Sequence, residues 1–196
     1  MKLGKAQYMK AMKSFKPITI VTGPAGTGKT YIACNQARRL LKDKVIDRVV
    51  VTRPNVNCDE QLGYLPGTYE EKLKPYLFPI FDNFDNFEKH KNMIEIAPLG
   101  FMRGRTFENT FIIADEMQNS TPNQMKTLLT RLGENSKIVI TGDTSQCDLK
   151  TNNGLTHLLN KMDLEMDYKY INIVKLGIND IKRHPLITEV LDIYNS

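Results

Sequence analysis

Short apolar runs rich in valine, isoleucine and threonine alternate along the chain with longer segments whose apolar residues recur at helical spacing. Short runs of this kind, bounded by turn residues, are typical of strands buried on both faces of a parallel sheet. The runs predicted as strands are residues 18–22, 48–52, 94–97, 110–114, 138–141 and 170–174. The segments predicted as helices are residues 6–15, 29–42, 79–89, 122–132 and 185–194.

Turn residues mark the ends of one predicted helix clearly. Thr121 and Pro122 form a typical helix start, because threonine caps the first turn and proline fits its first position, and Gly133 is a typical end. No segment rich in proline, glycine or serine divides the chain, so residues 1–196 are interpreted as one domain. Strands that alternate with helices predict an α/β fold, in which helices cover both faces of a mostly parallel sheet.

The composition is that of an ordinary globular protein, with 41% hydrophobic and 25% charged residues. No apolar run approaches the roughly 20 residues that cross a bilayer, and no apolar core follows the basic start as in a signal peptide. We therefore expect a cytoplasmic protein without a membrane partner. Cys34, Cys58 and Cys147 are widely spaced, so neither a zinc site nor a disulfide framework is predicted. The net charge of +5 permits nucleic-acid binding without requiring it.

A glycine-rich segment follows the first predicted strand and fits the phosphate-binding pattern G-x-x-x-x-G-K-[ST] at every fixed position. Glycines let successive backbone N–H groups converge on phosphates, and the N-terminus of the following helix adds a favourable partial charge. The pattern predicts that Lys29 reaches the β- and γ-phosphates of ATP, while the Thr30 hydroxyl holds Mg²⁺. The residues predicted to bind the nucleotide are Gly23, Pro24, Ala25, Gly26, Thr27, Gly28, Lys29 and Thr30.

Two adjacent carboxylates end the predicted strand 110–114. A buried strand that ends in a carboxylate places Asp115 beside Mg²⁺, through a water molecule. The next residue, Glu116, can orient and deprotonate a water for attack on the γ-phosphate. This pair favours hydrolysis over transfer to a second substrate, so the sequence predicts a Mg²⁺-dependent ATPase rather than a small-molecule kinase.

A third polar segment, Gly142 to Gln146, follows the predicted strand 138–141. Gly142 allows close approach of the backbone, and Asp143 and Gln146 are candidates for contact with the γ-phosphate or the attacking water. Such a contact would distinguish ATP from ADP. A plain turn rich in glycine, aspartate and serine has a similar composition, so this interpretation depends on the two motifs before it.

Together with further segments, these motifs resemble the PhoH family of P-loop ATPases, which itself resembles the first lobe of superfamily 1 helicases. The further segments are 52–54, 62–67, 70–76, 97–106, 115–119, 130–133 and 180–186. The resemblance extends over nearly the whole chain and implies a single three-layer αβα P-loop NTPase domain. Met117, Gly100 and Lys182 depart from the residues usual in the family.

The resemblance also implies roles that spacing alone does not show. Gln7 stands where related helicases use a glutamine to read adenine through paired hydrogen bonds, although a surface glutamine is an equally good interpretation. Thr52 and Arg53 resemble a segment that contacts the backbone of a single strand. An arginine that pairs with a carboxylate is the alternative for Arg53. Arg103 is a further candidate for contact with nucleic acid.

Hydrolysis of this kind is usually accelerated by an arginine that neutralises charge on the γ-phosphate, often inserted from a neighbouring subunit. Two-lobed helicases supply this arginine from their second lobe, to which no part of this sequence corresponds. A homo-oligomeric ring, with a hexamer favoured, would let each subunit complete the site of its neighbour. The candidate arginines are Arg103, Arg105, Arg131 and Arg183.

Two functions fit these residues. The first is an ATP-driven enzyme of RNA metabolism that acts on RNA or single-stranded nucleic acid as a helicase-like oligomer. The alternative is a nucleotide-switched assembly or adaptor ring that docks a nuclease or a ribosome-maturation partner. The alternative needs the same ATP site but no movement along a strand, so stimulation of the ATPase by nucleic acid separates the two.

Overall fold

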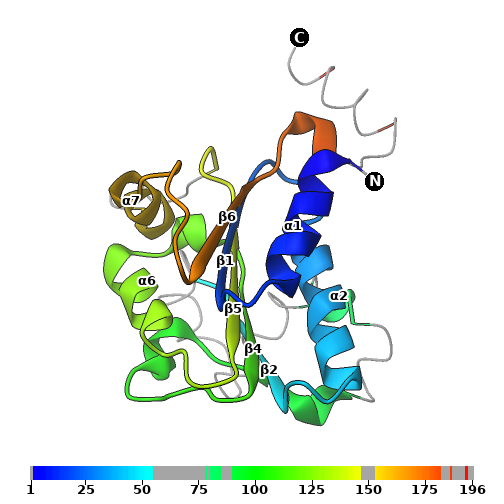
Figure 1. Cartoon of the computed structure of the whole chain (residues 1–196), viewed down its shortest axis with the longest axis vertical. Coiled ribbons are helices and arrows are strands. Elements are labelled where there is room, and N and C mark those ends of the chain that lie inside the picture. The colour runs from blue at the N-terminus through cyan, green and yellow to red at the C-terminus, as the bar shows by residue number, and fades with distance from the viewer. Residues whose placement is uncertain are drawn as a thin grey trace.

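The computed structural model describes residues 2–54, 78, 80–84, 90–146, 153–181, 186 and 193. Within these ranges six parallel strands form one sheet in the order β3-β2-β4-β5-β1-β6 (Figure 1). The strands are β1 (Ile18–Thr22), β2 (Arg48–Thr52), β3 (Ile94–Ile96), β4 (Thr110–Ala114), β5 (Lys137–Gly142) and β6 (Ile171–Lys175). The predicted α/β fold with a parallel sheet is confirmed.

Helices cover both faces of this sheet. On one face lie α1 (Leu3–Lys13) and α2 (Lys29–Lys42), and on the other lie α6 (Pro122–Leu129) and α7 (Gly154–Lys161) (Figure 1). The short 3-10 helices are η1 (Lys91–Met93), η2 (Leu99–Met102), η3 (Met117–Asn119) and η4 (Ile178–Asp180). The result is the predicted three-layer arrangement.

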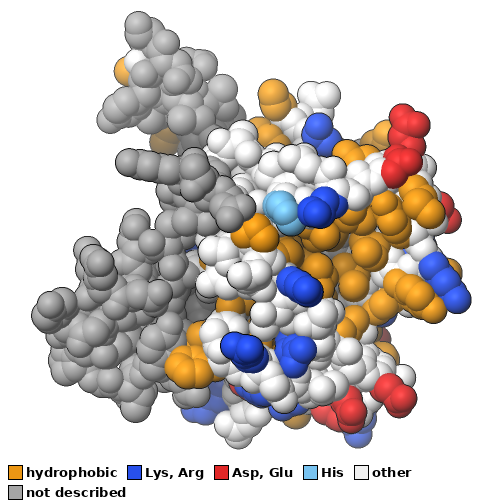
Figure 2. Space-filling view, turned by 90° about the vertical axis from the view of Figure 1, so that its left-hand side faces the viewer, with side chains coloured by type: hydrophobic (Ala, Val, Ile, Leu, Met, Phe, Trp, Pro, Cys, Tyr) orange, Lys and Arg blue, Asp and Glu red, His pale blue; other side chains and the backbone are white. Residues whose placement is uncertain are grey.

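Each face of the sheet buries its own apolar cluster. Consecutive residues of a strand point to opposite faces, so Val21 packs under α1 and α2 while its neighbour Ile20 packs under α6 and α7. Because both faces are covered, the inner strands read as continuous apolar runs. Figure 2 views the molecule from the side of α6 and α7, where hydrophobic side chains gather with charged side chains of both signs around them.

The strand order brings the candidate chemistry to one edge of the sheet. The neighbouring strands β4, β5 and β1 all run in the same direction, so the segments that follow them leave the sheet at the same edge. These segments carry the glycine-rich loop, the Asp115–Glu116 pair and the turn after Gly142. Open parallel sheets bind ligands at the carboxyl ends of their strands, so this edge is the place for a site.

The bounds of two helices differ from the sequence-based expectation. The first helix begins at Leu3 rather than residue 6 and ends at Lys13, where Lys137 from β5 donates hydrogen bonds to the carbonyl oxygens of Met12 and Ser14. The helix predicted to reach residue 132 ends at Leu129.

The early end of α6 has a clear cause in the chain that follows it. The N–H of Phe107 donates to the carbonyl of Arg131, and the N–H of Gly133 donates to the carbonyl of Phe107. Residues 131–133 therefore pair with a distant segment instead of continuing the helix. The predicted cap at the other end is confirmed, since Thr121 and Gln124 form a reciprocal capping box.

Several predicted features lie wholly or partly outside the described residues. They include the helix 185–194, Cys58, Cys147 and most of the segment 79–89, of which Phe81 and Phe84 are buried as expected. Cys34 is buried in α2, and burial raises the pKa of its thiol to about 12, so it stays protonated at neutral pH. Among the described residues, no helix has the length and apolar character needed to span a membrane.

Candidate active site

The glycine-rich loop connects β1 to α2 and depends on backbone conformations that glycine adopts without strain. Gly23, Gly26 and Gly28 all have positive φ, at 148°, 78° and 84°. At Gly23 a Cβ would also lie 2.5 Å from the carbonyl oxygen of Leu176, which follows β6. No other residue fits there unless the end of β6 moves, so the loop begins at a fixed point on the sheet.

Lys29 is the first residue of α2, and its ammonium group folds back over the loop. Nζ donates to the carbonyl oxygens of Gly23 at 2.6 Å and Pro24 at 3.1 Å. Burial lowers the pKa of Lys29, while the nearby carboxylates of Glu116, Asp143 and Asp115 act in the opposite direction. Two neutral carbonyls are weaker partners than phosphate oxygens, so the ammonium is placed to bind an anion that enters the loop.

The hydroxyl of Tyr8 connects α1 to the start of α2, a contact that sequence reasoning missed. Tyr8 is fully buried, and its hydroxyl donates to the carbonyl oxygen of Lys29 at 3.1 Å. In the sequence, the one signal for such a bond is a tyrosine at a position expected to be buried, because a buried hydroxyl needs a partner. The spacing of residues along the chain does not identify that partner. The bond fixes α1 against Lys29, whose ammonium lies over the loop.

Asp115 gathers two hydroxyl groups from neighbouring elements. Its Oδ1 accepts hydrogen bonds from Thr30 Oγ1 at 2.8 Å and from Thr141 Oγ1 at 2.5 Å. The structure thus brings together the two residues predicted to hold a metal ion, Thr30 and Asp115, and adds Thr141, which the sequence analysis did not single out. All three are held at the carboxyl edge of the sheet.

The donor set at this position fits Mg²⁺. One hydroxyl and one carboxylate are hard oxygen ligands, and Mg²⁺ keeps several waters and takes its other ligands from phosphates. Within the described part of the chain, no group of three or more His, Cys, Asp or Glu side chains could hold a metal by itself. Thr30 and Asp115 would therefore hold Mg²⁺ together with the phosphates of a nucleotide.

Glu116 adopts a backbone conformation that is uncommon for a residue with a side chain. Its φ is 53°, in the left-handed region, and the 3-10 helix η3 begins directly after it. One oxygen of its carboxylate, Oε2, accepts a hydrogen bond of 2.6 Å from Nε2 of Gln118. The local turn and this bond fix the half-buried carboxylate, whose negative charge acts to raise the pKa of Lys29.

Asp143 is buried at the end of β5, although it carries a carboxylate. Its Oδ1 accepts hydrogen bonds from the backbone N–H and the hydroxyl of Ser145, at 3.0 and 2.6 Å. Its Oδ2 is buried without a hydrogen-bond partner among the described residues. A buried oxygen left in this way is typical of a group that completes its bonding with a ligand or water. Gln146 is exposed, and its backbone N–H donates to the carbonyl oxygen of Asp143 in this turn.

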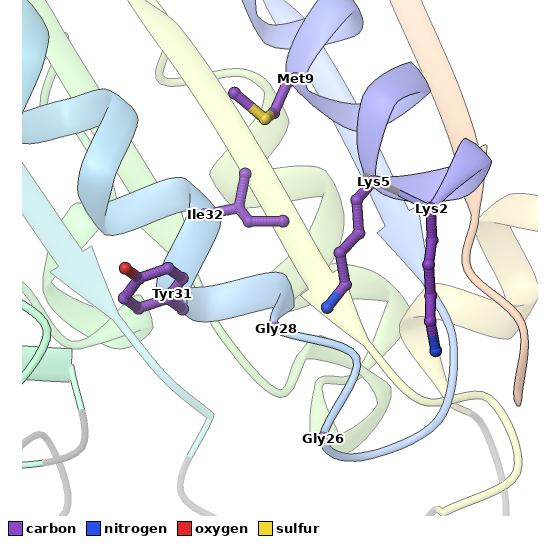
Figure 3. Close-up of a pocket in the computed structure, with 7 residues that line it drawn as sticks. All are labelled: Lys2, Lys5, Met9, Gly26, Gly28, Tyr31 and Ile32. Atoms are coloured by element: carbon purple, nitrogen blue, oxygen red, sulfur yellow. The ribbon is translucent and has the colours of Figure 1, made fainter. Parts of the chain in front are cut away.

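A cavity of about 770 Å³ opens beside the loop, between α1 and α2 (Figure 3). The described residues that line it are Lys2, Lys5, Met9, Gly26, Gly28, Tyr31 and Ile32. The ammonium of Lys5 approaches the loop, 3.8 Å from where a Cβ on Gly28 would stand. This combination of apolar side chains and a glycine-rich wall suits the base and ribose of a nucleotide whose phosphates lie in the loop.

Gln7 is exposed on α1 and is not among the lining residues described for this cavity. Lys5 and Met9 are four residues apart and share one helix face, whereas a residue two positions along the helix points to the other side. The structure therefore does not bring Gln7 to the loop.

The candidate residues for nucleic-acid contact differ in exposure. Thr52 is buried at the end of β2, and its hydroxyl has no hydrogen-bond partner among the described residues. Arg53 is half-buried, and Arg103 is exposed beside η2. The structure thus places the positive charge of Arg53 next to the carboxyl end of β2 and that of Arg103 on the surface.

Arg105 lies away from the loop of its own chain. Its Nη1 forms an ion pair of 2.5 Å with Glu95, and its guanidinium stacks on Phe107 at 4.6 Å from the ring centroid. The same cluster holds Arg48, the first residue of β2, which pairs with Glu95 at 3.3 Å. Arg131 donates to the carbonyl oxygen of Arg105. Arg183 lies outside the described residues.

The family model described as PhoH-like protein matches residues 1–195 of the chain. A PhoH-like protein of Bacillus subtilis (strain 168) is 42% identical over 203 residues, which cover 98% of this chain and 62% of that protein. Protein PhoH of Escherichia coli (strain K12) is 40% identical over 200 residues, which cover 96% of this chain and 55% of that protein. The chain thus spans less than two thirds of these relatives. The structure of the Pif1 helicase from Candida albicans aligns with a TM-score of 0.48 at 18% identity, covering 100% of this chain and 43% of that one.

Proposed function

Since the chain belongs to the PhoH-like protein family, we propose that it is a cytoplasmic, Mg²⁺-dependent ATPase that acts on RNA or single-stranded nucleic acid. Its family and its phosphate loop make it a nucleotide-binding P-loop NTPase. One observation carries the proposal of hydrolysis. Thr30 donates a hydrogen bond of 2.8 Å to Asp115, directly beside Glu116 in the chain. We propose that residues 1–196 act as one ATPase domain.

The proposed reaction assigns each polar group a separate task. The loop amides and Lys29 bind the β- and γ-phosphates, and Thr30 and Asp115 hold Mg²⁺, which neutralises phosphate charge when bound. Glu116 accepts a proton from water as the water oxygen bonds to the γ-phosphorus. The bond from that phosphorus to the β–γ bridging oxygen breaks, and ADP leaves with the electron pair. Asp143 and Gln146 report whether a γ-phosphate is present.

The cavity between α1 and α2 supports a place for the base of ATP. Met9, Ile32 and Tyr31 offer apolar and aromatic contact to a planar ring, next to the loop that takes the phosphates. An adenine-reading role for Gln7 stays part of the proposal, and it requires α1 to present another face to the loop than it does in this structure.

Single-stranded RNA or DNA should raise the rate of ATP hydrolysis, because Thr52, next to Arg53, accepts a hydrogen bond from the backbone N–H of Asp115 and so connects proposed strand contacts to the ATP site. The stimulation should fall steeply as salt rises, since phosphate contacts release counterions. Phosphate release is measured with RNA, DNA and duplex oligonucleotides across a salt series.

Two arginine variants and one control make this test specific. Arg53→Ala and Arg103→Ala should each raise the oligonucleotide concentration that gives half-maximal stimulation. Arg39→Ala removes an exposed charge from the far end of α2 and should leave that concentration unchanged. An ATPase that no nucleic acid stimulates would contradict the strand-handling role and favour the adaptor ring.

The proposed ring predicts complementation between two inactive variants. Arg105 is paired with Glu95 in a cluster at the start of β2, so it cannot serve the loop of its own chain in this arrangement. Mixing Lys29→Ala subunits with Arg183→Ala or Arg105→Ala subunits in equal amounts should restore about a quarter of the wild-type rate. Half of the sites keep the loop, and half of their neighbours keep the arginine.

The mixing experiment is read together with the size of the assembly. Light scattering in the presence of ATP reports whether the expected hexamer forms. A monomer in ATP, with no rate restored by either arginine variant, would refute the ring, and the missing positive charge would have to come from a partner protein.

A further inference from the structure

Gln118 connects the ends of two strands through one buried side-chain amide. It lies in η3 and is 2% exposed. Its Nε2 donates to Oε2 of Glu116 at 2.6 Å, and its Oε1 accepts from the backbone N–H of Asp143 at 3.1 Å. Glu116 follows β4 and Asp143 belongs to the turn after β5, so a single amide spans the two segments that carry the proposed hydrolytic groups.

The partners of Gln118 determine which way its amide points. The N–H of Asp143 can only donate, and the carboxylate oxygen Oε2 of Glu116 is an acceptor. The oxygen of the amide must therefore face Asp143 and its nitrogen must face Glu116. Reversing the amide would leave a buried N–H opposite another N–H and an oxygen opposite a carboxylate.

The absence of a side chain at residue 142 leaves room for this amide. A Cβ on Gly142 would lie 2.9 Å from Oε1 of Gln118 and 3.3 Å from its backbone nitrogen. Glu116 itself has a φ of 53°, in the left-handed region, directly before η3. Glycine at 142 and the bond from Gln118 thus act on the same small region between β4 and β5.

We propose that Gln118 is a positioning residue that holds the carboxylate of Glu116 in register with the turn that carries Asp143. This inference rests on the proposed ATPase function. When the side chain of Asp143 contacts a γ-phosphate, any shift of this residue also moves its backbone N–H. The amide of Gln118 then transmits the shift to the carboxylate of Glu116, which activates water. Hydrolysis therefore depends on Gln118, whereas binding of ATP depends on the loop and on Lys29.

Two substitutions separate the hydrogen bonds of Gln118 to Glu116 and to Asp143. Gln118→Glu keeps an oxygen for the N–H of Asp143 but loses the donor to Glu116 and places a second carboxylate beside it. Gln118→Met keeps the approximate volume and loses both bonds. Each should lower kcat roughly 10- to 100-fold, the range expected when a catalytic group is misplaced by about 1 Å. The affinity for ATP should change by less than about twofold, because Lys29 and the loop are untouched.

Gln124→Glu is the matched control. It makes the same chemical change six residues further on, in the capping box of α6, where glutamate accepts the same backbone hydrogen bond as glutamine. Its kcat and ATP affinity should equal those of the wild type. Thermal unfolding of each variant shows that the fold is intact.

The decisive measurement places Gln118→Met in a Glu116→Gln background. If Gln118 acts through Glu116, the double variant should hydrolyse ATP at the rate of Glu116→Gln alone. A multiplied loss in the double variant would overturn the inference, as would a normal kcat in Gln118→Met or a loss confined to ATP affinity. Wild-type protein that hydrolyses no ATP in the same assay would instead overturn the proposed function itself.

Discussion

Replacing Lys29 with alanine should abolish productive ATP binding. The ammonium is held over the loop by the carbonyl oxygens of Gly23 and Pro24, where it would meet the β- and γ-phosphates. Losing a buried charge-assisted contact of this kind should weaken affinity roughly 100-fold or more. The carboxylates of Glu116, Asp143 and Asp115 would then repel the incoming phosphates without a compensating cation from the loop.

Titration of a fluorescent ATP analogue measures this effect directly. Lys42→Ala is the control, because Lys42 is exposed in the last turn of the same helix and carries the same charge. Its affinity should match that of the wild type. Wild-type affinity in Lys29→Ala would refute the assignment of the phosphate loop.

Replacing Glu116 with glutamine should preserve ATP binding and lower hydrolysis by about 100-fold or more, the scale expected for losing a general base. The substitution changes one oxygen to an amide nitrogen and keeps the shape of the side chain. The remaining carbonyl oxygen can still accept the hydrogen bond from Gln118, so the turn should stay folded. An amide cannot take the proton of the attacking water.

Phosphate release and nucleotide binding are measured on the same preparation. Glu134→Gln neutralises an exposed carboxylate in the turn before β5 and should leave both quantities unchanged. Normal turnover in Glu116→Gln would mean that its carboxylate is structural and that another group positions the water. If Glu116→Gln behaves as expected, it accumulates in the ATP-bound state and is suitable for capturing partners that bind this state.

The amino-acid sequence predicted the frame of the molecule well because its inner strands are continuous β-branched runs. The bounds of β1, β2, β4 and α2 were predicted to the residue, and the loop between β1 and α2 was identified from its glycines and Lys29. These signals are local. A strand buried on both faces, or a loop that needs positive φ, restricts the residue types at consecutive positions.

Contacts between distant segments were not predictable in the same way. The hydrogen bonds of Tyr8 to Lys29, Thr141 to Asp115 and Gln118 to Asp143 each connect residues more than 20 positions apart. The end of α6 was missed for the same reason, since residues 131–133 pair with Phe107. No spacing rule encodes these pairs, because they depend on which strands become neighbours.

The bond between Thr30 and Asp115 has a consequence for the entropy of cation binding. The hydroxyl of Thr30 has one proton, and it is donated to the carboxylate at 2.8 Å. Both lone pairs of that oxygen are therefore turned away from Asp115 and available to a cation. A divalent ion would bind the hydroxyl of Thr30 after folding has already restricted the rotation of this side chain. Little side-chain entropy is therefore lost when the ion binds. Such preorganisation favours a small ion with strict octahedral geometry over a larger ion that tolerates a loose shell.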